Sequence, residues 1–246
     1  MIRKVARLMV GSAQAGGWSE RHYFLLRRLH SLAGLVPVGV FVTFHLLINS
    51  TIVSGGQAFQ TGVDQIHLLG KLGMLEVVEI FGIFLPMLFH AVLGVKIWLE
   101  GTPTVGQYRY GGNLRYTLQR ITGVAGFAFI LIHLWHMHWL GKPFGGGHFD
   151  PHRAAETASA AMQSGWWYAP IYVIGVLCVV YHLANGIWTS LITWGITVGP
   201  GAQRKAGWVC AAFGVIVGLA GLSAVRGFRT FDVAGATVEQ VEDSGH

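Results

Sequence analysis

The chain has 246 residues, of which 52% are hydrophobic and only 11% are charged. Soluble domains carry roughly 25% charged residues, so this composition excludes an ordinary soluble protein and indicates a protein of the lipid bilayer. The formal net charge is +6. In a membrane protein the position of the cations matters more than their sum, and no nucleic-acid partner is expected.

Runs of about 20 apolar residues predict five membrane-spanning helices. The runs cover about residues 30–53, 74–99, 117–140, 167–194 and 206–228. Before the first run the apolar stretches are short and interrupted by charges, which is not the pattern of a cleaved signal. The sequence therefore predicts an all-α membrane protein with five transmembrane helices.

The cations predict how these helices are oriented. One side of the membrane receives Arg3, Lys4, Arg7, Arg21, Arg27, Arg28, Lys96, Arg109, Arg115, Arg120, Arg204 and Lys205, and the other receives only Lys71, Lys142, Arg153, Arg226 and Arg229. By the positive-inside rule the N-terminus is cytoplasmic and the C-terminus is outside. We expect a cytoplasmic segment at 1–29, a transmembrane domain at 30–228 and a polar tail at 229–246.

Four histidines lie deep in the first four apolar runs, one in each. They are His45, His90, His133 and His182. An imidazole in hydrocarbon is costly and normally faces the interior of a bundle, where a partner compensates for the lost water. A single such histidine is as readily explained by a hydrogen bond between helices or by a proton path. Four of them indicate two shared partners, and we interpret these partners as two haems.

Depth predicts which histidines share a haem. Each of the four lies about 15 or 16 residues along its run, which is about 22–24 Å from the point of entry at 1.5 Å per residue. Consecutive helices run in opposite directions, so His45 and His133 should lie near the outer face and His90 and His182 near the cytoplasmic face. One haem is expected between each pair. His136 shares roughly the face of His133, and spacing alone does not exclude it as the outer ligand.

Small residues recur near these histidines. His90 and His182 each begin an H-x-x-x-G pattern, ending at Gly94 and Gly186, which places a glycine one turn from the histidine on the same face. Gly34 and Gly123 precede His45 and His133 at similar offsets. These offsets suggest that helices one and two repeat as helices three and four, although glycines also serve ordinary helix packing in membranes.

Four stretches of the chain resemble a known family. RRLHSLAGLVPVGVFVTFHLLIN, EIFGIFLPMLFHAVLGV, LQRITGVAGFAFILIHLWH and VVYHLANGIWTSLITWGITVGPGAQR are similar to the single-subunit, five-helix, two-haem cytochrome b anchor of succinate dehydrogenases and fumarate reductases, over about residues 23 to 226. The resemblance implies bis-histidine ligation of two haem b groups with the same pairing, and it favours His133 over His136. The first twenty residues, the third loop and the tail after Arg229 have no counterpart in the resemblance.

The resemblance also implies partners and a location. A flavoprotein subunit with FAD would interconvert succinate and fumarate, an iron–sulfur subunit would pass the electrons, and this chain would anchor both in the inner membrane of a bacterium and exchange electrons with quinone. The chain itself has no dinucleotide fingerprint and no C-x-x-C motif. It is therefore expected to be the membrane subunit of an enzyme complex whose dicarboxylate chemistry lies on a partner.

Quinone chemistry needs protons, and Glu79 is the candidate catalytic residue. It lies in an apolar run at the expected depth of the His45–His133 pair, where a carboxylate costs several kcal/mol unless it is protonated or partnered. Glu76, one turn earlier, is better explained as an interfacial carboxylate. For the haem propionates, cations and hydroxyls at the cytoplasmic edge are candidates, namely Arg28, Ser31, Arg120 and His30; His30 by itself reads as an interfacial residue.

Two other classes of protein fit part of the pattern. A quinol-oxidising cytochrome b of another respiratory complex would share the fold and the haems, but one histidine on each of the first four helices favours the succinate or fumarate anchor. A transporter or channel with a histidine proton relay would hold no haem, and a reduced-minus-oxidised spectrum would distinguish it.

Overall fold

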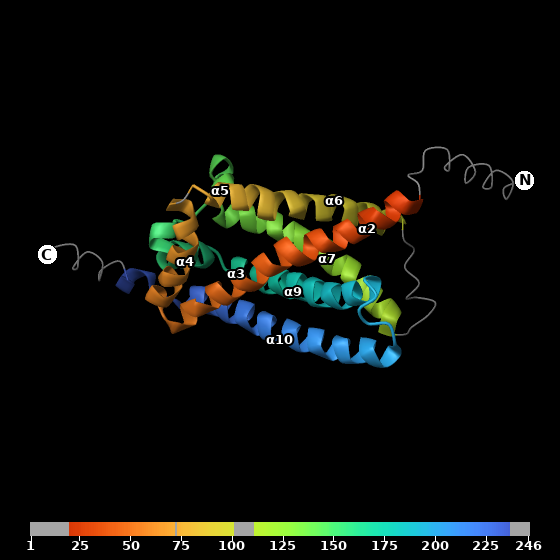
Figure 1. Ribbon diagram of the computed structural model, residues 1–246. Coiled ribbons are helices and arrows are strands. Elements are labelled where there is room, and N and C mark those ends of the chain that lie inside the picture. The colour runs from red at the N-terminus through yellow and green to blue at the C-terminus, as the bar shows by residue number, and fades with distance from the viewer. Residues whose placement is uncertain (1–19, 72, 101–110, 237–246) are drawn as a thin grey trace, which may run out of the picture.

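The computed structural model describes residues 20–71, 73–100 and 111–236, and every regular element in those ranges is helical. Five stretches are long and apolar enough to cross a membrane, at His22–Ser54, Leu75–Glu100, Gly111–Met137, Tyr168–Thr193 and Pro200–Thr230. They form a bundle in which consecutive spans run in opposite directions (Figure 1). The prediction of an all-α protein with five membrane helices is confirmed.

The first two spans are interrupted helices. The first consists of α2 (Glu20–Ala33), η2 (Gly34–Gly39), α3 (Val40–Ser50) and η3 (Thr51–Ser54), and the second of α5 (Leu75–Val77), η4 (Val78–Phe84) and α6 (Leu85–Glu100). Both η2 and η4 are π-helical, and η2 contains Pro37, which has no N–H to donate. Such π turns shift the register of a helix and are common at functional sites.

The other three spans are continuous: α7 (Gly111–Met137), α9 (Tyr168–Thr193) and α10 (Pro200–Thr230). Several helices extend beyond the apolar runs, because a helix satisfies its own backbone hydrogen bonds and can continue into the headgroup region. α2 thus begins at Glu20, and α10 begins at Pro200. The third span ends earlier than its apolar run, at Met137, because His138 adopts extended backbone angles of φ −78° and ψ 149°.

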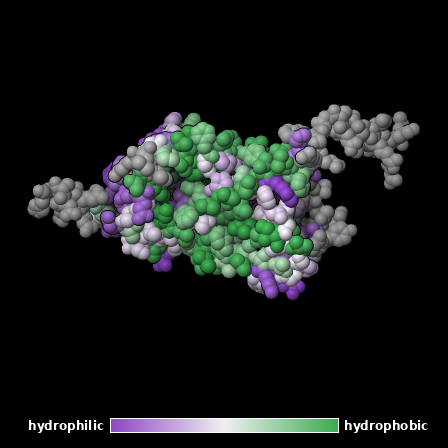
Figure 2. Space-filling view, in the orientation of Figure 1, coloured by the Kyte–Doolittle hydropathy of each residue, from purple (hydrophilic) through white to green (hydrophobic). Residues whose placement is uncertain are grey.

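The best-packed part of the bundle lies between α9 and α10. Val176 and Val180 of α9 and Val217 and Ala224 of α10 belong to one buried apolar cluster. α6, in contrast, has no buried residue. Figure 2 shows a hydrophobic band around the middle of the molecule with hydrophilic residues gathered at both ends. The large apolar side chains exposed in this band are therefore suited to lipid rather than to water.

One end of the bundle carries short helices that lie between the predicted membrane runs or beside them. They are α4 (Gly56–Lys71), η5 (Trp139–Phe144), η6 (Pro151–Arg153) and α8 (Ala154–Gln163), and we call this end the capped end (Figure 1). Gln60 of α4 donates to the Pro151 carbonyl at 2.7 Å and accepts from the Ala154 N–H at 2.9 Å. The opposite end, where α2 begins, is called the N-terminal end.

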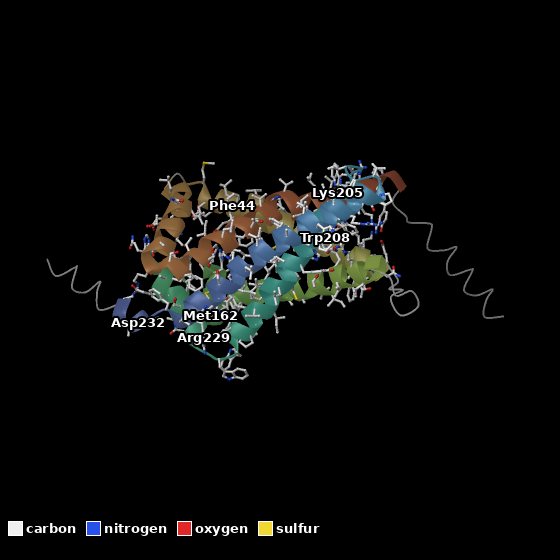
Figure 3. The ribbon with its side chains drawn as sticks, turned by 90° about the horizontal axis from the view of Figure 1, so that it is seen from below. Phe44, Met162, Lys205, Trp208, Arg229 and Asp232 are labelled. Carbon is white, nitrogen blue, oxygen red and sulfur yellow. The ribbon has the colours of Figure 1, made fainter. Side chains whose placement is uncertain are left out.

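The cap is also tied to α10. Gln163 of α8 donates to the carbonyls of Phe228 and Phe231 at 3.0 and 2.9 Å. Arg229 donates to the Met162 carbonyl at 3.1 Å, and Figure 3 shows both of these residues at the capped end. Met162 is 2% exposed. The capped end is therefore a packed layer whose buried residues continue the apolar cluster of α9 and α10.

The contact between α7 and α9 depends on a glycine. A Cβ added at Gly175 of α9 would overlap the ring of Phe129 of α7. We predict that Gly175→Ala lowers stability by about 1–3 kcal/mol, the usual cost of overpacking. Gly201→Ala is the matched control, because a Cβ on that helical glycine meets no atom within 4 Å. Thermal unfolding in detergent, followed by circular dichroism, measures the difference, and equal midpoints for the two variants would contradict this packing.

Candidate functional site

The four predicted histidines meet in two pairs. His45 of α3 and His133 of α7 have ring centroids 5.8 Å apart, with an interplanar angle of 72°. His90 of α6 and His182 of α9 have ring centroids 5.9 Å apart, with an angle of 86°. The first pair lies towards the capped end, because both residues are close to the last turns of their helices. The structure thus brings together the same histidines that were paired by their expected depth in the membrane.

The spacing within each pair suits a metal ion held between two imidazoles. Metal–imidazole bonds are about 2 Å long, so two nitrogens on opposite sides of one ion are about 4 Å apart and their ring centres about 6 Å apart. The observed centroid distances of 5.8 and 5.9 Å are close to this value. Among the described residues no group of three or more His, Cys, Asp or Glu side chains is placed to hold one metal ion. The candidate ligands are therefore the two members of each histidine pair.

Hydrogen bonds orient the second pair. Nδ1 of His90 donates to the His30 carbonyl at 2.8 Å, and Nδ1 of His182 donates to the Gln119 carbonyl at 2.9 Å. A carbonyl oxygen only accepts, so both rings carry their proton on Nδ1 when they are neutral. Nε2 of each ring then has a free lone pair. A carbonyl that accepts from the other ring nitrogen is the usual support of a metal-binding histidine.

Glycines make this approach possible. A Cβ at Gly34 would overlap the His90 ring, and a Cβ at Gly123 would stand 2.7 Å from Cε1 of His182. In both cases the glycine follows the accepting carbonyl by four residues, since Gly34 follows His30 and Gly123 follows Gln119. The contact between the first two spans and the contact between the third and fourth spans thus both place a glycine against an imidazole. This agrees with the repeat that the glycine offsets suggested.

The first pair is supported by side chains instead. Asn49 Nδ2 lies 3.5 Å from Nδ1 of His45 and donates to the His45 carbonyl at 2.7 Å. The Tyr172 hydroxyl lies 3.3 Å from Nδ1 of His133 and 2.9 Å from Nδ1 of His136. Tyr172 therefore contacts both His133 and His136, which sequence spacing alone left as alternative partners of His45.

His136 occupies a different environment from His133. Its side chain is fully buried, and its ring is stacked on Tyr168 at 3.9 Å with an angle of 4°. The ring contacts of His45 are with Phe41 and His133. The geometry therefore favours His133 as the partner of His45.

Four candidate polar residues gather at the N-terminal end beside the His90–His182 pair. The His30 ring, expected at the interface, is stacked on His90 at 4.0 Å. Nε of Arg28 and Nη1 of Arg120 are buried and have no hydrogen-bond partner in the described parts of the chain. The Ser31 hydroxyl is already paired with that of Ser190 at 2.6 Å. Two guanidinium groups thus present buried donors that suit an anionic group.

Glu79 is paired with a histidine at the capped end. Its carboxylate lies 3.8 Å from Nε2 of His138, and the two side chains are 24% and 20% exposed, respectively. Phe84 contacts the edge of the His138 ring at 5.5 Å between ring centres. Burial lowers the pKa of His138, and the Glu79 carboxylate partly opposes this shift. Glu79 is therefore neither fully buried nor unpartnered.

The sequence analysis missed several polar residues that support the site. Asn185 donates to the Gln119 side chain at 2.8 Å, and Gln119 donates to the His182 carbonyl at 3.0 Å. Tyr172 and His138 were also assigned no role. The available signal was the presence of amide and hydroxyl groups within apolar runs, where polar side chains bond to neighbouring helices.

Five membrane helices with partly buried histidine pairs between them define an integral membrane protein whose site lies within the bundle. The family described as succinate dehydrogenase/fumarate reductase transmembrane subunit matches residues 102–221. The succinate dehydrogenase cytochrome b558 subunit of Bacillus subtilis (strain 168) is 36% identical over 210 residues, which cover 85% of this chain and 99% of that relative. The chain belongs to the family of cytochrome b membrane subunits of succinate dehydrogenase and fumarate reductase, as the resemblance implied.

The Glu79–His138 pair predicts a pH dependence. The ordinary pKa of histidine is 6.5, and burial lowers that of His138. The unfolded chain therefore binds more protons than the folded chain below about pH 6.5, and the contribution of this group to stability falls as the pH is lowered. Glu79→Gln removes the opposing attraction, so we predict a larger loss of thermal midpoint between pH 7.5 and 5.

Matched variants isolate this effect from other titrating groups. In a His138→Gln background the Glu79→Gln change should no longer alter the slope of thermal midpoint against pH. The explanation fails if the single variant has the slope of the parent, or if the extra loss persists without His138.

Proposed function

We propose that this chain binds two haem b groups and carries electrons between the iron–sulfur subunit of a succinate dehydrogenase or fumarate reductase and a membrane quinone. The observation that best supports the proposal is that four histidines form two pairs, His45 with His133 and His90 with His182. In each pair the distance between the ring centres suits one metal ion. The Bacillus subtilis relative is a cytochrome b558 subunit by name, which supports haem b.

In this proposal the four histidines would hold the two haems, with one imidazole pair for each group. Haem bound in this way supplies one-electron transfer. The chain's own contribution is to fix the ligand rings through the carbonyls of His30 and Gln119, and to keep water away within an apolar bundle.

The propionates of the haem between His90 and His182 are assigned to Arg28 and Arg120. Their unpartnered buried N–H groups support this assignment, since a charge-assisted hydrogen bond to a carboxylate would satisfy them. The stacked ring of His30 lies at the same edge. Ser31 remains a proposed contact, through a hydroxyl that it shares with Ser190.

Quinone chemistry is assigned to the capped end, with Glu79 as the residue that handles protons. The carboxylate is partly exposed and lies beside His138, so the two groups can exchange a proton with each other and with water at the surface. His138 follows His133 by five residues along the chain. The pair therefore stands near the end of the bundle that holds His45 and His133.

The proposed complex is oriented with the N-terminal end in the cytoplasm of a bacterium. Arg115, Arg204 and Lys205 lie at this end, which supports the positive-inside orientation in the inner membrane. Arg109 and the N-terminal cations Arg3, Lys4 and Arg7, which are also expected there, lie outside the described residues. This face is the proposed platform for the iron–sulfur subunit, which in turn would hold the FAD-containing flavoprotein.

Haem content tests the ligand assignment. We predict two haem b per chain by the pyridine haemochrome assay. Ala variants of His45, His90, His133 or His182 should each hold one haem or fewer, because an imidazole is lost from one of the two sites. His152→Ala, at an exposed residue of η6, should retain two. A parent with clearly fewer than two haems would contradict the proposal, and loss of haem in His136→Ala but not in His133→Ala would overturn the outer ligand.

Quinone turnover tests Glu79. Glu79→Gln keeps the shape of the side chain and removes its titration, so haem content should be preserved while turnover falls by about 100-fold or more, the low end for general acid–base catalysis. Glu76→Gln, one turn earlier, serves as the control and should retain the parent rate. Turnover within a factor of two of the parent in Glu79→Gln, at all pH values, would exclude Glu79 from the proton route.

A further inference from the structure

A groove runs along the membrane-facing side of the α9–α10 pair. Its walls are apolar and include Leu177 and Tyr181 from α9 and Val215 and Leu222 from α10. Gly214 and Gly218 also line it, so the floor on α10 has no side chains at these positions. We call this feature the α9–α10 groove. It lies away from the histidine pairs, and the proposed electron transfer does not use it.

The groove opens into a basic basin at the N-terminal end. This basin is lined by Arg204 and Gln203, and by the first residues of α7 and α10, including Gly111 and Pro200. Arg115, Trp188, Gly207 and Ala211 line both the groove and the basin, so the two are continuous. Among the residues that the structure describes, no carboxylate lines either one. The helix N-termini add partial positive charge to that of the two arginines.

Arg115 is held at the junction of the groove and the basin. Its guanidinium lies over the Trp188 ring at 4.3 Å. The indole is itself fixed, because Trp188 Nε1 donates to the Gln203 carbonyl at 2.8 Å. A Cβ at Gly207 would come 3.6 Å from Nη1 of Arg115. Arg115 forms no ion pair with a carboxylate in the described parts of the chain.

We propose that the α9–α10 groove and its basin bind one anionic phospholipid. Its phosphate lies between Arg115 and Arg204, and an acyl chain lies along the groove. The charge of the site argues for this occupant, because two cations without a carboxylate favour an anionic headgroup over a zwitterionic one. The arrangement of the two parts also fits a lipid, because the basic basin lies at the end of the bundle and continues into the apolar groove. Trp208, at the same end of α10 in Figure 3, is 74% exposed and suits the headgroup level.

Lipid exchange on the solubilised complex tests the proposal. The complex containing this chain is washed free of lipid in detergent, and phosphatidylglycerol or phosphatidylcholine with the same acyl chains is added. Bound lipid phosphorus per chain and the thermal midpoint are then measured. We expect one tightly held phosphatidylglycerol per chain, with an affinity about thirtyfold above that of phosphatidylcholine, since each cation is worth roughly fivefold for an anionic lipid.

Variants distinguish binding of the lipid headgroup from binding of the acyl chain. The double change Arg115→Gln and Arg204→Gln should remove the preference for phosphatidylglycerol, and Ala211→Phe should reduce binding of both lipids at least tenfold by filling the groove. Lys205→Gln, on the same turn as Arg204, and Ala212→Phe, an exposed neighbour of Ala211, are the matched controls and should bind like the parent.

Several outcomes would overturn the proposal. These are equal binding of the two lipids by the parent, equal loss in the control variants, the same stabilisation by inorganic phosphate alone, or copurification of a quinone in the groove in place of the lipid. A variant that fails to assemble is recognised by its elution in size-exclusion chromatography. In that case the parent's preference between the two lipids decides the question by itself.

Discussion

The hydrogen bond from an imidazole to a helix carbonyl is the constraint on which the rest of the bundle depends. A histidine in hydrocarbon must satisfy its N–H, and in a helix every interior carbonyl already has a partner. Cα–Cβ bonds tilt towards the helix N-terminus, so the side chain four residues later covers a carbonyl. Gly34 and Gly123 leave the carbonyls of His30 and Gln119 uncovered, and His90 and His182 use them.

This requirement explains several features at once. The contact between helices one and two and the contact between helices three and four each place a glycine against an imidazole. The proton of each ring is fixed on Nδ1, so Nε2 of each ring keeps a free lone pair. The His45–His133 pair at the capped end is supported differently, because its partners are the side chains of Tyr172 and Asn49. The two proposed haems therefore have different surroundings on one scaffold.

Hydropathy predicts the number of helices and the pairing of the histidines, because both depend on length and depth alone. It does not predict the cap, since α4 and α8 are held by contacts with segments distant in sequence, such as those of Gln60 with Pro151 and of Gln163 with Phe228. The stacking of His30 on His90 was missed for a related reason: a residue beside Arg27 and Arg28 reads as interfacial, whereas its ring is turned towards a neighbouring helix. The pairing of Glu79 with His138 depends on where α7 ends, which no periodicity encodes.

A density map of the intact complex, obtained by electron cryo-microscopy in detergent or nanodiscs, tests the central claim most directly. Two planar macrocycles are predicted, one coordinated by His45 and His133 and one by His90 and His182, with Nδ1 of the latter two still bonded to the carbonyls of His30 and Gln119. A single macrocycle, or coordination of either iron by His30 or His136, would contradict it.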